Sequence, residues 1–403
     1  MAYNTPETFA KALTKKYNQG LKEIAYSETP FISMMPKNTD FGGDKDVTGI
    51  LVQGINASTS FASAMNRRGT LNPDAFELDV VEAYGIASVT NKSLLKARKS
   101  PYALGVLLDM LVNSATMAFW RQATQRGWGN GGGAIGKIKD VTTNCITLDD
   151  LNTVRHFQVG QPLEFSTADG TSGSVKPNVA NGAIIEKVDR DDGKLYASGN
   201  WSAVCPTIAN VDYIFGEGDF GNNCFGAGAW IPETTPTGSF AGVDRTKDPT
   251  RTAGTRVQAN GADVEDAVID FVKQVNRNGG AGMDTLFLDP EKFAEFQKNA
   301  AAKNYPQVTG NTDIKHITFK GYEMPTANGA MKIMLDPECP STSGLGTKMS
   351  DWLMFSMGET PFWEKQSGDK ILVEVAADAK QMRLIGYYNF KCKNPVNSGR
   401  LVW

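Results

Sequence analysis

Histidine and cysteine most often hold metals or carry covalent catalysis, so their number and spacing are the first test of chemistry. The 403 residues contain only two histidines, His156 and His316, and neither lies in a recognisable catalytic or metal-binding motif. The five cysteines are scattered, and no two of them form a C-x-x-C pair. An odd, scattered set indicates thiols that stay reduced in a cytoplasm. We therefore expect no metal, no cofactor and no catalytic residues, and we predict that the protein is not an enzyme.

Two stretches have partial ligand-binding patterns. Residues 131–137 match the start of a phosphate-binding loop, but Ile138 stands where Ser or Thr would hold magnesium, and the stretch follows a helix instead of a strand. Residues 189–193 resemble part of a calcium loop, but the glycine comes one place early and no closing Glu follows. We interpret the first stretch as a flexible exit from the helix and the second as a hairpin turn.

The bulk composition limits the class of protein. Hydrophobic residues make up 41% and charged residues 21%, which is typical of an ordered globular chain with about two or three domains. The net charge is −3, whereas tight binding to nucleic acid usually requires a basic excess. The N-terminus has no apolar signal-peptide core, and no run of about 18 apolar residues occurs. We therefore expect no signal peptide, no membrane span and no tight direct contact with nucleic acid.

A long helix is predicted over residues 101–126. Ser100 can cap it, Pro101 suits its first turn, and Gly127 is expected to end it. Its predicted apolar stripe consists of Leu104, Leu107, Leu108, Leu111, Ala115, Ala118 and Phe119. At about 1.5 Å per residue the helix would be roughly 40 Å long, which is long for a globular domain. Such a helix can act as a spine on which sheets and neighbouring subunits pack.

An amphipathic helix is predicted over residues 5–25. Phe9, Leu13 and Tyr17 fall on one face, and lysines flank that face. The helix could pack on its own domain, or it could be an arm that packs on a neighbouring subunit.

A long hairpin is predicted over residues 41–90. Its tip, residues 56–74, consists mostly of small polar residues and is longer than most connections in a compact domain. Arg67 and Arg68 lie in this tip. They could be solvated surface residues, or they could bind carboxylates on another chain.

The remainder changes from a β-rich to an α/β pattern. Residues 138–230 contain short strands separated by turn signals, which predicts a small barrel or sandwich. Residues 232–251 form a linker rich in Pro, Gly and Thr. After it, a helix is predicted over residues 264–275, a strand over 285–288 and a helix that begins at Asp289 and Pro290. Further strands are predicted over 317–319, 331–335, 352–356, 371–375, 383–390 and 401–403.

The order of these elements, with three local patterns at residues 240–254, 285–293 and 383–388, resembles the major capsid proteins of tailed bacteriophages. The resemblance covers nearly the whole chain and implies an α+β, Hong Kong-97-type shell fold. It implies an N-terminal arm (1–35), an extended loop with its base (36–90), a spine helix of the peripheral domain (91–133), a β-rich insertion domain (134–232), an axial domain with its linker (233–375) and C-terminal strands that return to the peripheral domain (376–403).

The resemblance also implies a function. Such a protein assembles with itself, as pentamers and hexamers, into an icosahedral shell that encloses double-stranded DNA and contacts it weakly and non-specifically. Scaffolding, portal and decoration proteins are possible partners, the host cytoplasm is the place of assembly, and the virion is the final location. The suspected contacts between subunits are Arg67, Arg68, Phe9, Leu13 and Tyr17.

One feature of the family is not expected here, and two alternative functions remain. Some members lock the shell by an isopeptide bond from a lysine of the extended loop, but residues 56–74 contain no lysine. The first alternative is the shell protein of a bacterial nanocompartment, which shares the fold. The second is a β-rich glycan-binding or hydrolytic protein, which would leave the spine helix and the N-terminal arm without a role.

Overall fold

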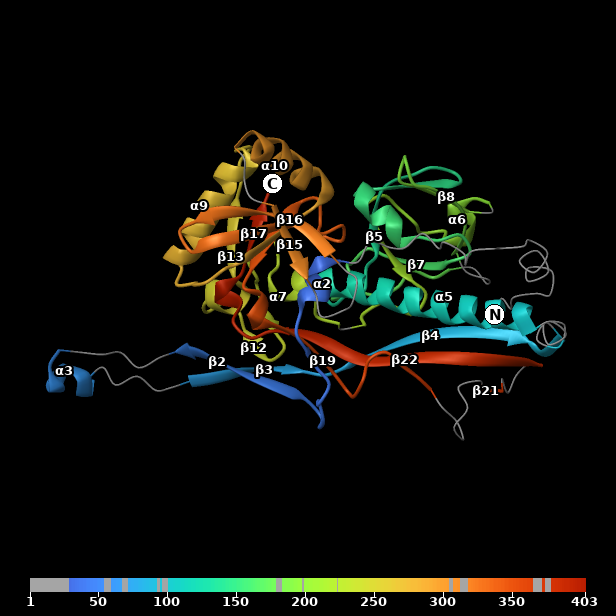
Figure 1. Ribbon diagram of the computed structural model, residues 1–403, viewed down its shortest axis with the longest axis horizontal. Helices are drawn as coiled ribbons and strands as arrows, with labels where there is room; N and C mark the ends of the chain where they lie inside the picture. The colour runs from blue at the N-terminus through green and yellow to red at the C-terminus, as the bar shows by residue number, and fades with distance from the viewer. Residues whose placement is uncertain are drawn as a thin grey trace.

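Two larger β-sheets, a small barrel, a projecting hairpin and one long helix make up the described part of the protein, as Figure 1 shows. The computed structural model describes residues 29–53, 59–66, 72–92, 95, 101–178, 183–197, 199–222, 224–303, 307–311, 318–364, 372–373 and 378–403. Outside the description lie Phe9, Leu13, Tyr17, Arg67, Arg68, His316 and the side chains of Leu104, Leu107, Leu108 and Leu111. Among the described helices, none is both long and apolar enough to cross a membrane. The predicted α+β class is confirmed.

The spine helix α5 (Pro101–Trp128) lies along a six-stranded sheet, and both are drawn together in Figure 1. The longest strand of the sheet is β22 (Ala379–Cys392), which pairs antiparallel with β4 (Val81–Thr90) and with β19 (Trp352–Ser356). The sheet also contains β1 (Lys37–Asn38), β20 (Phe362–Trp363) and β21 (Leu372–Val373). The predicted spine helix is confirmed and forms one layer over this sheet.

The apolar stripe of α5 is narrower than predicted. Ala115, Phe119 and Ala123 are buried at a spacing of four residues, whereas Ala118 is exposed. Adjacent residues of a helix point about 100° apart, so Ala118 turns away from the sheet when Phe119 faces it.

The prediction that Gly127 ends the helix is wrong, because α5 continues to Trp128. A β-carbon at Gly127 would lie 2.1 Å from Cδ1 of Ile32, so glycine is needed here for close packing and not for a helix cap. Ile32 belongs to the short helix α2 (Pro30–Met34), whose Phe31 is fully buried against Trp128. Residues 29–35, which were assigned to the N-terminal arm, are therefore part of the core.

A seven-stranded sheet forms the second layered unit. In spatial order its strands are β13 (Thr255–Gln258), β23 (Gly399–Val402), β18 (Ser343–Thr347), β14 (Thr285–Leu288), β17 (Gly329–Leu335), β16 (Thr318–Thr326) and β15 (Gln307–Asn311). The helices α9 (Val264–Arg277) and α10 (Pro290–Lys303) pack beside it (Figure 1). The apolar face of α9 is buried, which confirms the helix predicted there.

Two strands lie in the opposite sheet from the one expected. Residues 352–356 were assigned to the axial domain, but they form β19 in the six-stranded sheet. The last strand, β23, was expected to return to the peripheral domain, but it pairs with β13 and β18 in the seven-stranded sheet. Arg400 fixes β23 there, because its buried Nε donates to the carbonyl of Ile231 at 2.8 Å. Such long-range pairing is not encoded in local periodicity.

The β-rich segment forms a closed barrel, which confirms the first of the two predicted architectures. Its strands, in spatial order, are β10 (Tyr213–Gly216), β5 (Gly136–Val141), β6 (Cys145–Leu148), β9 (Lys194–Ala197), β8 (Ala183–Asp189) and β7 (Pro162–Ser166). The 3-10 turn η1 (Leu151–His156) and the short helix α6 (Trp201–Val204) lie between strands. Residues 190–193 connect β8 to the antiparallel β9, so the predicted hairpin turn is also confirmed.

The prediction of a flexible exit at residues 131–137 is wrong. A β-carbon at Gly132 would lie 2.0 Å from the carbonyl oxygen of Asp169, and one at Gly133 would lie 2.0 Å from that of Asp219. Gly133 also has a φ of +87°, which glycine adopts readily. The glycines therefore form a closely packed joint between α5 and the barrel.

Three arginines hold the segment that leaves the barrel. Arg245 donates to the carbonyl of Ala229 at 2.7 Å, and Arg256 donates through Nε to the carbonyls of Pro232 and Thr234, both at 2.9 Å. Together with Arg400, which binds the carbonyl of Ile231, they satisfy four carbonyls between residues 229 and 234. The small elements of this region are α7 (Ala227–Trp230), β11 (Ser239–Phe240), β12 (Val243–Asp244) and α8 (Pro249–Ala253), with η2 (Met349–Asp351) and η3 (Pro395–Asn397) later in the chain.

The joint at Gly132 gives a stability prediction. Gly132→Ala should lower the free energy of unfolding by about 1–3 kcal/mol, because the backbone of Asp169 and Gly170 leaves no room for the methyl group. Gly199→Ala is the matched control, since its β-carbon position has no atom within 4 Å. Chemical denaturation of both variants would measure the difference, and equal stabilities would contradict the packed joint.

Candidate functional site

The most exposed candidate site is an arm that projects from the body of the molecule (Figure 1). It consists of the antiparallel strands β2 (Asp46–Gln53) and β3 (Asn72–Leu78) and of the short helix α3 (Phe61–Asn66), which lies at the far end. The predicted long hairpin is confirmed for these residues. The two strands form a sheet of their own, and no further described strand pairs with either outer edge, although the base of β3 is held by a backbone hydrogen bond to the body.

The base of the arm is fixed to the body. Phe76 is fully buried, and its ring centroid lies 4.9 Å from that of Trp230. The backbone N–H of Glu77 donates to the carbonyl of Ala241 at 2.8 Å. Lys391 of β22 forms an ion pair with Asp46. These contacts set the direction in which the arm leaves the body.

The tip of the arm exposes apolar side chains. Phe61 is 82% exposed and Met65 is 47% exposed, and their spacing of four residues places them on one face of α3. Ser60 Oγ accepts a hydrogen bond from the N–H of Ser63 at 3.2 Å and so stabilises the first turn. A six-residue helix on a two-stranded hairpin is marginally stable alone in water, so a partner surface would stabilise it.

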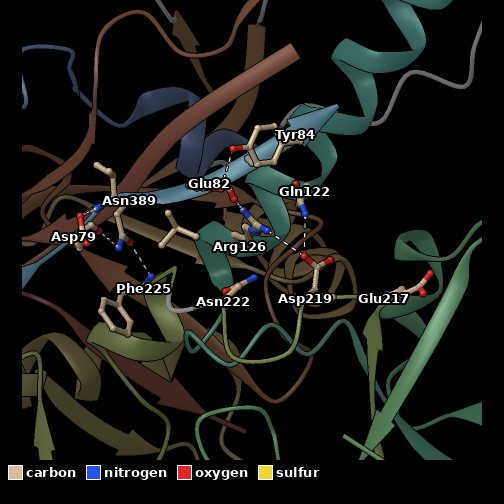
Figure 2. Close-up of a pocket in the computed structure, with 14 residues that line it drawn as sticks. Asp79, Glu82, Tyr84, Gln122, Arg126, Glu217, Asp219, Asn222, Phe225 and Asn389 are labelled. Carbon is tan, nitrogen blue, oxygen red and sulfur yellow. Dashed lines mark hydrogen bonds and ion pairs between the residues drawn. The ribbon is translucent and has the colours of Figure 1, made fainter. Parts of the chain in front are cut away.

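A second candidate site is a cleft of about 610 Å³ between β4, α5 and the barrel, which we call the β4 cleft (Figure 2). Residues 79–84 form one wall, Gln122 and Arg126 of α5 form the floor, and residues 217–219 with Asn222, in the loop after the barrel strand β10, form the other wall. Phe225 and Asn389 close one end.

Hydrogen bonds connect the walls of the β4 cleft, as Figure 2 shows. Arg126 donates to the backbone carbonyl of Glu82 at 2.9 Å and to Oδ1 of Asp219 at 3.1 Å. Gln122 donates to the same Asp219 oxygen at 3.2 Å. No sequence pattern indicates this network, because its members come from β4, α5 and the barrel, and sequence spacing cannot reveal their proximity.

The rim of the β4 cleft carries unpaired carboxylates. Asp79, Glu82 and Glu217 are exposed, and none of them forms an ion pair with a described residue. Tyr84 donates to Oε2 of Glu82 at 2.8 Å, and hydrogen bonds with Tyr387 and Glu82 raise the pKa of Tyr84. Among the described residues that line the cleft, Arg126 is the only basic one, and it already binds Asp219. The cleft is therefore suited to a cationic partner.

A third cluster is buried where the barrel meets the seven-stranded sheet. His156 Nε2 lies 2.5 Å from Oε2 of Glu338, and His156 Nδ1 donates to the carbonyl of Ile135 at 2.8 Å. Arg155 lies 3.9 Å from the other oxygen of Glu338. Ser341 Oγ donates to Asp150 at 3.0 Å. These contacts fix the barrel to residues 336–342, the loop between β17 and β18.

Burial and charge shift the pKa values in this cluster. Burial alone would lower the pKa of His156, but the Glu338 carboxylate raises it above its usual value. Burial alone would raise the pKa of Glu338, but His156 and Arg155 hold it below its usual value. Burial raises the pKa of Asp336 to about 7, although backbone N–H groups of Phe31 and Glu338 oppose the shift. Both shifts favour the ionised form of the pair of His156 and Glu338, and the pair holds the barrel against residues 336–342.

None of these sites has the geometry of a metal centre. Among the described residues, no group of three or more His, Cys, Asp or Glu side chains is positioned to hold a metal ion. Burial raises the pKa of Cys224 and of Cys392 to about 12, so these thiols are protonated and unreactive at neutral pH.

Comparisons with known proteins bear on the fold. No protein-family model and no curated protein matches the sequence. A chain of the Cyanophage A-1(L) capsid asymmetric unit superposes with a TM-score of 0.54 at 11% identity, over 97% of this chain and 98% of that one. The chain has a phage capsid fold of the Hong Kong-97 type. Other similar structures include a Gordonia phage Cozz chain (TM-score 0.45, 11% identity, 97% of this chain and 91% of that one) and the SrpI encapsulin of Synechococcus elongatus PCC 7942 (TM-score 0.42, 7% identity, 100% and 96%).

Within this capsid fold, the pair of His156 and Glu338 gives a prediction about pH. His156→Gln should lower the free energy of unfolding by about 3–5 kcal/mol at about pH 6, because Glu338 is left buried without its histidinium partner. The folded pKa of His156 is raised, so its contribution is fully present below about 6.5 and is lost as the pH rises through the folded pKa. The difference between wild type and variant should therefore shrink as the pH rises above about 6.5.

Denaturant unfolding at several pH values would measure this difference. His316→Gln, at the only other histidine of the sequence, is the control and should leave the pH dependence unchanged. A destabilisation by His156→Gln that is the same at both ends of the pH range would mean that the ion pair does not stabilise the fold.

Proposed function

We propose that this chain is the major capsid protein of a tailed bacteriophage, which assembles with itself into an icosahedral shell that encloses double-stranded DNA. The capsid fold is compatible with this function, and the projecting arm is the observation that supports it most directly. Beyond its base, the described part of the arm has strand edges without a partner and an exposed apolar tip, and both would be satisfied by a neighbouring subunit in a closed shell.

The proposal extends to the parts of the subunit. The six-stranded sheet with α5 would form the peripheral domain, the seven-stranded sheet would form the axial domain, and the barrel would be an insertion domain. Subunits would associate as pentamers and hexamers, with scaffolding, portal and decoration proteins as further partners. With a net charge of −3, contact with the packaged DNA would be weak and non-specific. Assembly would occur in the host cytoplasm.

Electron microscopy of the purified protein, with any scaffold supplied, tests the function directly. Large icosahedral shells would support it. Small uniform shells would indicate the shell protein of a nanocompartment instead. If no particles form and light scattering shows a compact monomer at high concentration, both shell functions would be overturned. A glycan-binding or hydrolytic protein would then be the favoured alternative.

The arm gives a prediction about assembly. Phe61→Ser, in the tip helix, and the double change Arg67→Ala with Arg68→Ala, in the sequence that follows it, should each reduce particle yield or the resistance of particles to salt and heat. An exposed ion pair contributes about 0–1 kcal/mol and a desolvated one about 2–5 kcal/mol, and each contact repeats at every interface of the shell. The melting temperature of the monomer should change little, because the tip adds little to the subunit's own core.

Val159→Ser is the matched control, since this barrel residue is also apolar and exposed but lies off the arm. If the arm variants lower monomer and particle stability equally, the arm side chains serve the subunit's own fold. If neither stability changes, they are ordinary surface residues. The contacts suspected for Phe9, Leu13 and Tyr17 are a separate part of the proposal and can be assessed in the same assay.

A further inference from the structure

The β4 cleft is lined by both acidic and apolar side chains. Asp79, Glu82 and Glu217 lie exposed around it and form no ion pair with a described residue, and Val80 and Val81 add apolar surface on the same wall. A partner that is both cationic and apolar would therefore be complementary to it. A metal ion alone would leave the apolar wall uncovered.

The sequence contains such a partner. Residues 8–22 include four lysines and no Asp or Glu. At a helical period of about 100° per residue, Lys11, Lys15 and Lys22 fall within a narrow arc, while Leu13 and Tyr17 fall on the other side. A segment with this pattern can place lysines at the acidic rim and apolar side chains against the valine wall.

The position where the described chain begins allows this segment to reach the cleft. Helix α2 follows directly after Thr29, and its Ile32 packs on Gly127 of α5. Arg126, the residue next to Gly127, lines the β4 cleft. Lys22 and Thr29 are separated by six residues, and the seven Cα–Cα steps between them can span roughly 23–25 Å, which is enough to pass around a helix of about 10–12 Å diameter.

We propose that the β4 cleft is a docking site for the basic segment formed by residues 8–22 of this protein. The lysines bind the carboxylates of Glu82 and Glu217, and the apolar face covers Val80 and Val81. Docking joins the N-terminal segment to β4 and to the barrel loop in a single contact. The inference does not depend on the formation of a shell, since the segment and the cleft are present in every chain.

Cleavage of the unassembled full-length protein by chymotrypsin after Tyr17 is the test. A docked segment resists cleavage, so the double variant Glu82→Gln with Glu217→Gln should be cleaved at least about tenfold faster than wild type at low salt, with an unchanged melting temperature. Added salt should accelerate cleavage of the wild type, because it screens rim charges. Glu186→Gln with Glu359→Gln makes the same change of charge at exposed residues outside the cleft and should have no effect.

Charge exchange makes the test specific. Lys11→Glu with Lys15→Glu should release the segment, and adding Glu82→Lys with Glu217→Lys should restore protection. Equal cleavage rates in wild type, cleft variant and control would overturn the proposal, as would a failure of the exchanged charges to restore protection. Because the assay is performed on unassembled protein, its outcome is independent of whether particles form.

Discussion

The buried carboxylates of residues 336–342 are the constraint on which the arrangement of the subunit depends. Asp336 accepts a hydrogen bond from the backbone N–H of Phe31 at 3.0 Å and so fixes α2, while Glu338 holds the barrel through His156. A buried carboxylate is strongly destabilising unless it is hydrogen-bonded or paired, so these groups permit few other arrangements of their partners. The start of the described chain, the barrel and the seven-stranded sheet are therefore positioned relative to one another by one short loop.

Local sequence patterns predicted helices and turns well, but they could not predict which strands pair with one another. Helices α5 and α9, strand β14 and the barrel hairpin follow from periodicity and turn residues, which are properties of neighbouring positions. Strand β18 (Ser343–Thr347) was missed because its glycines obscure the alternation of a strand. Gly127 and Gly132 were interpreted as a helix stop and a flexible exit. Glycine has the same signature in a sequence whether it ends a helix or permits close packing, and only the contacts distinguish the two.

The candidate sites also differ in whether the sequence could predict them. The arm was predictable because a long stretch of small polar residues between two strand patterns leaves nothing to bury. The pair of His156 and Glu338 was not, since the two residues lie 182 positions apart and neither belongs to a motif. The β4 cleft was missed for a related reason: its wall, floor and rim come from three parts of the chain. Of the contacts suspected between subunits, Arg67 and Arg68 adjoin the exposed helix α3 in sequence, but they lie outside the described residues.

The contrast between the body and the arm is itself an argument for assembly. In the body, glycines admit contacts that a single methyl group would block, and the barrel closes on itself without free edges. Beyond its base, the described part of the arm has strand edges without a partner and an exposed Phe61, and such features favour aggregation of an isolated subunit. A closed symmetric shell removes this disadvantage, because every arm then meets the same surface on its neighbour and no edge remains open. A well-packed body is needed for that geometry, since the direction of the arm is set by Phe76 and Asp46 at its base.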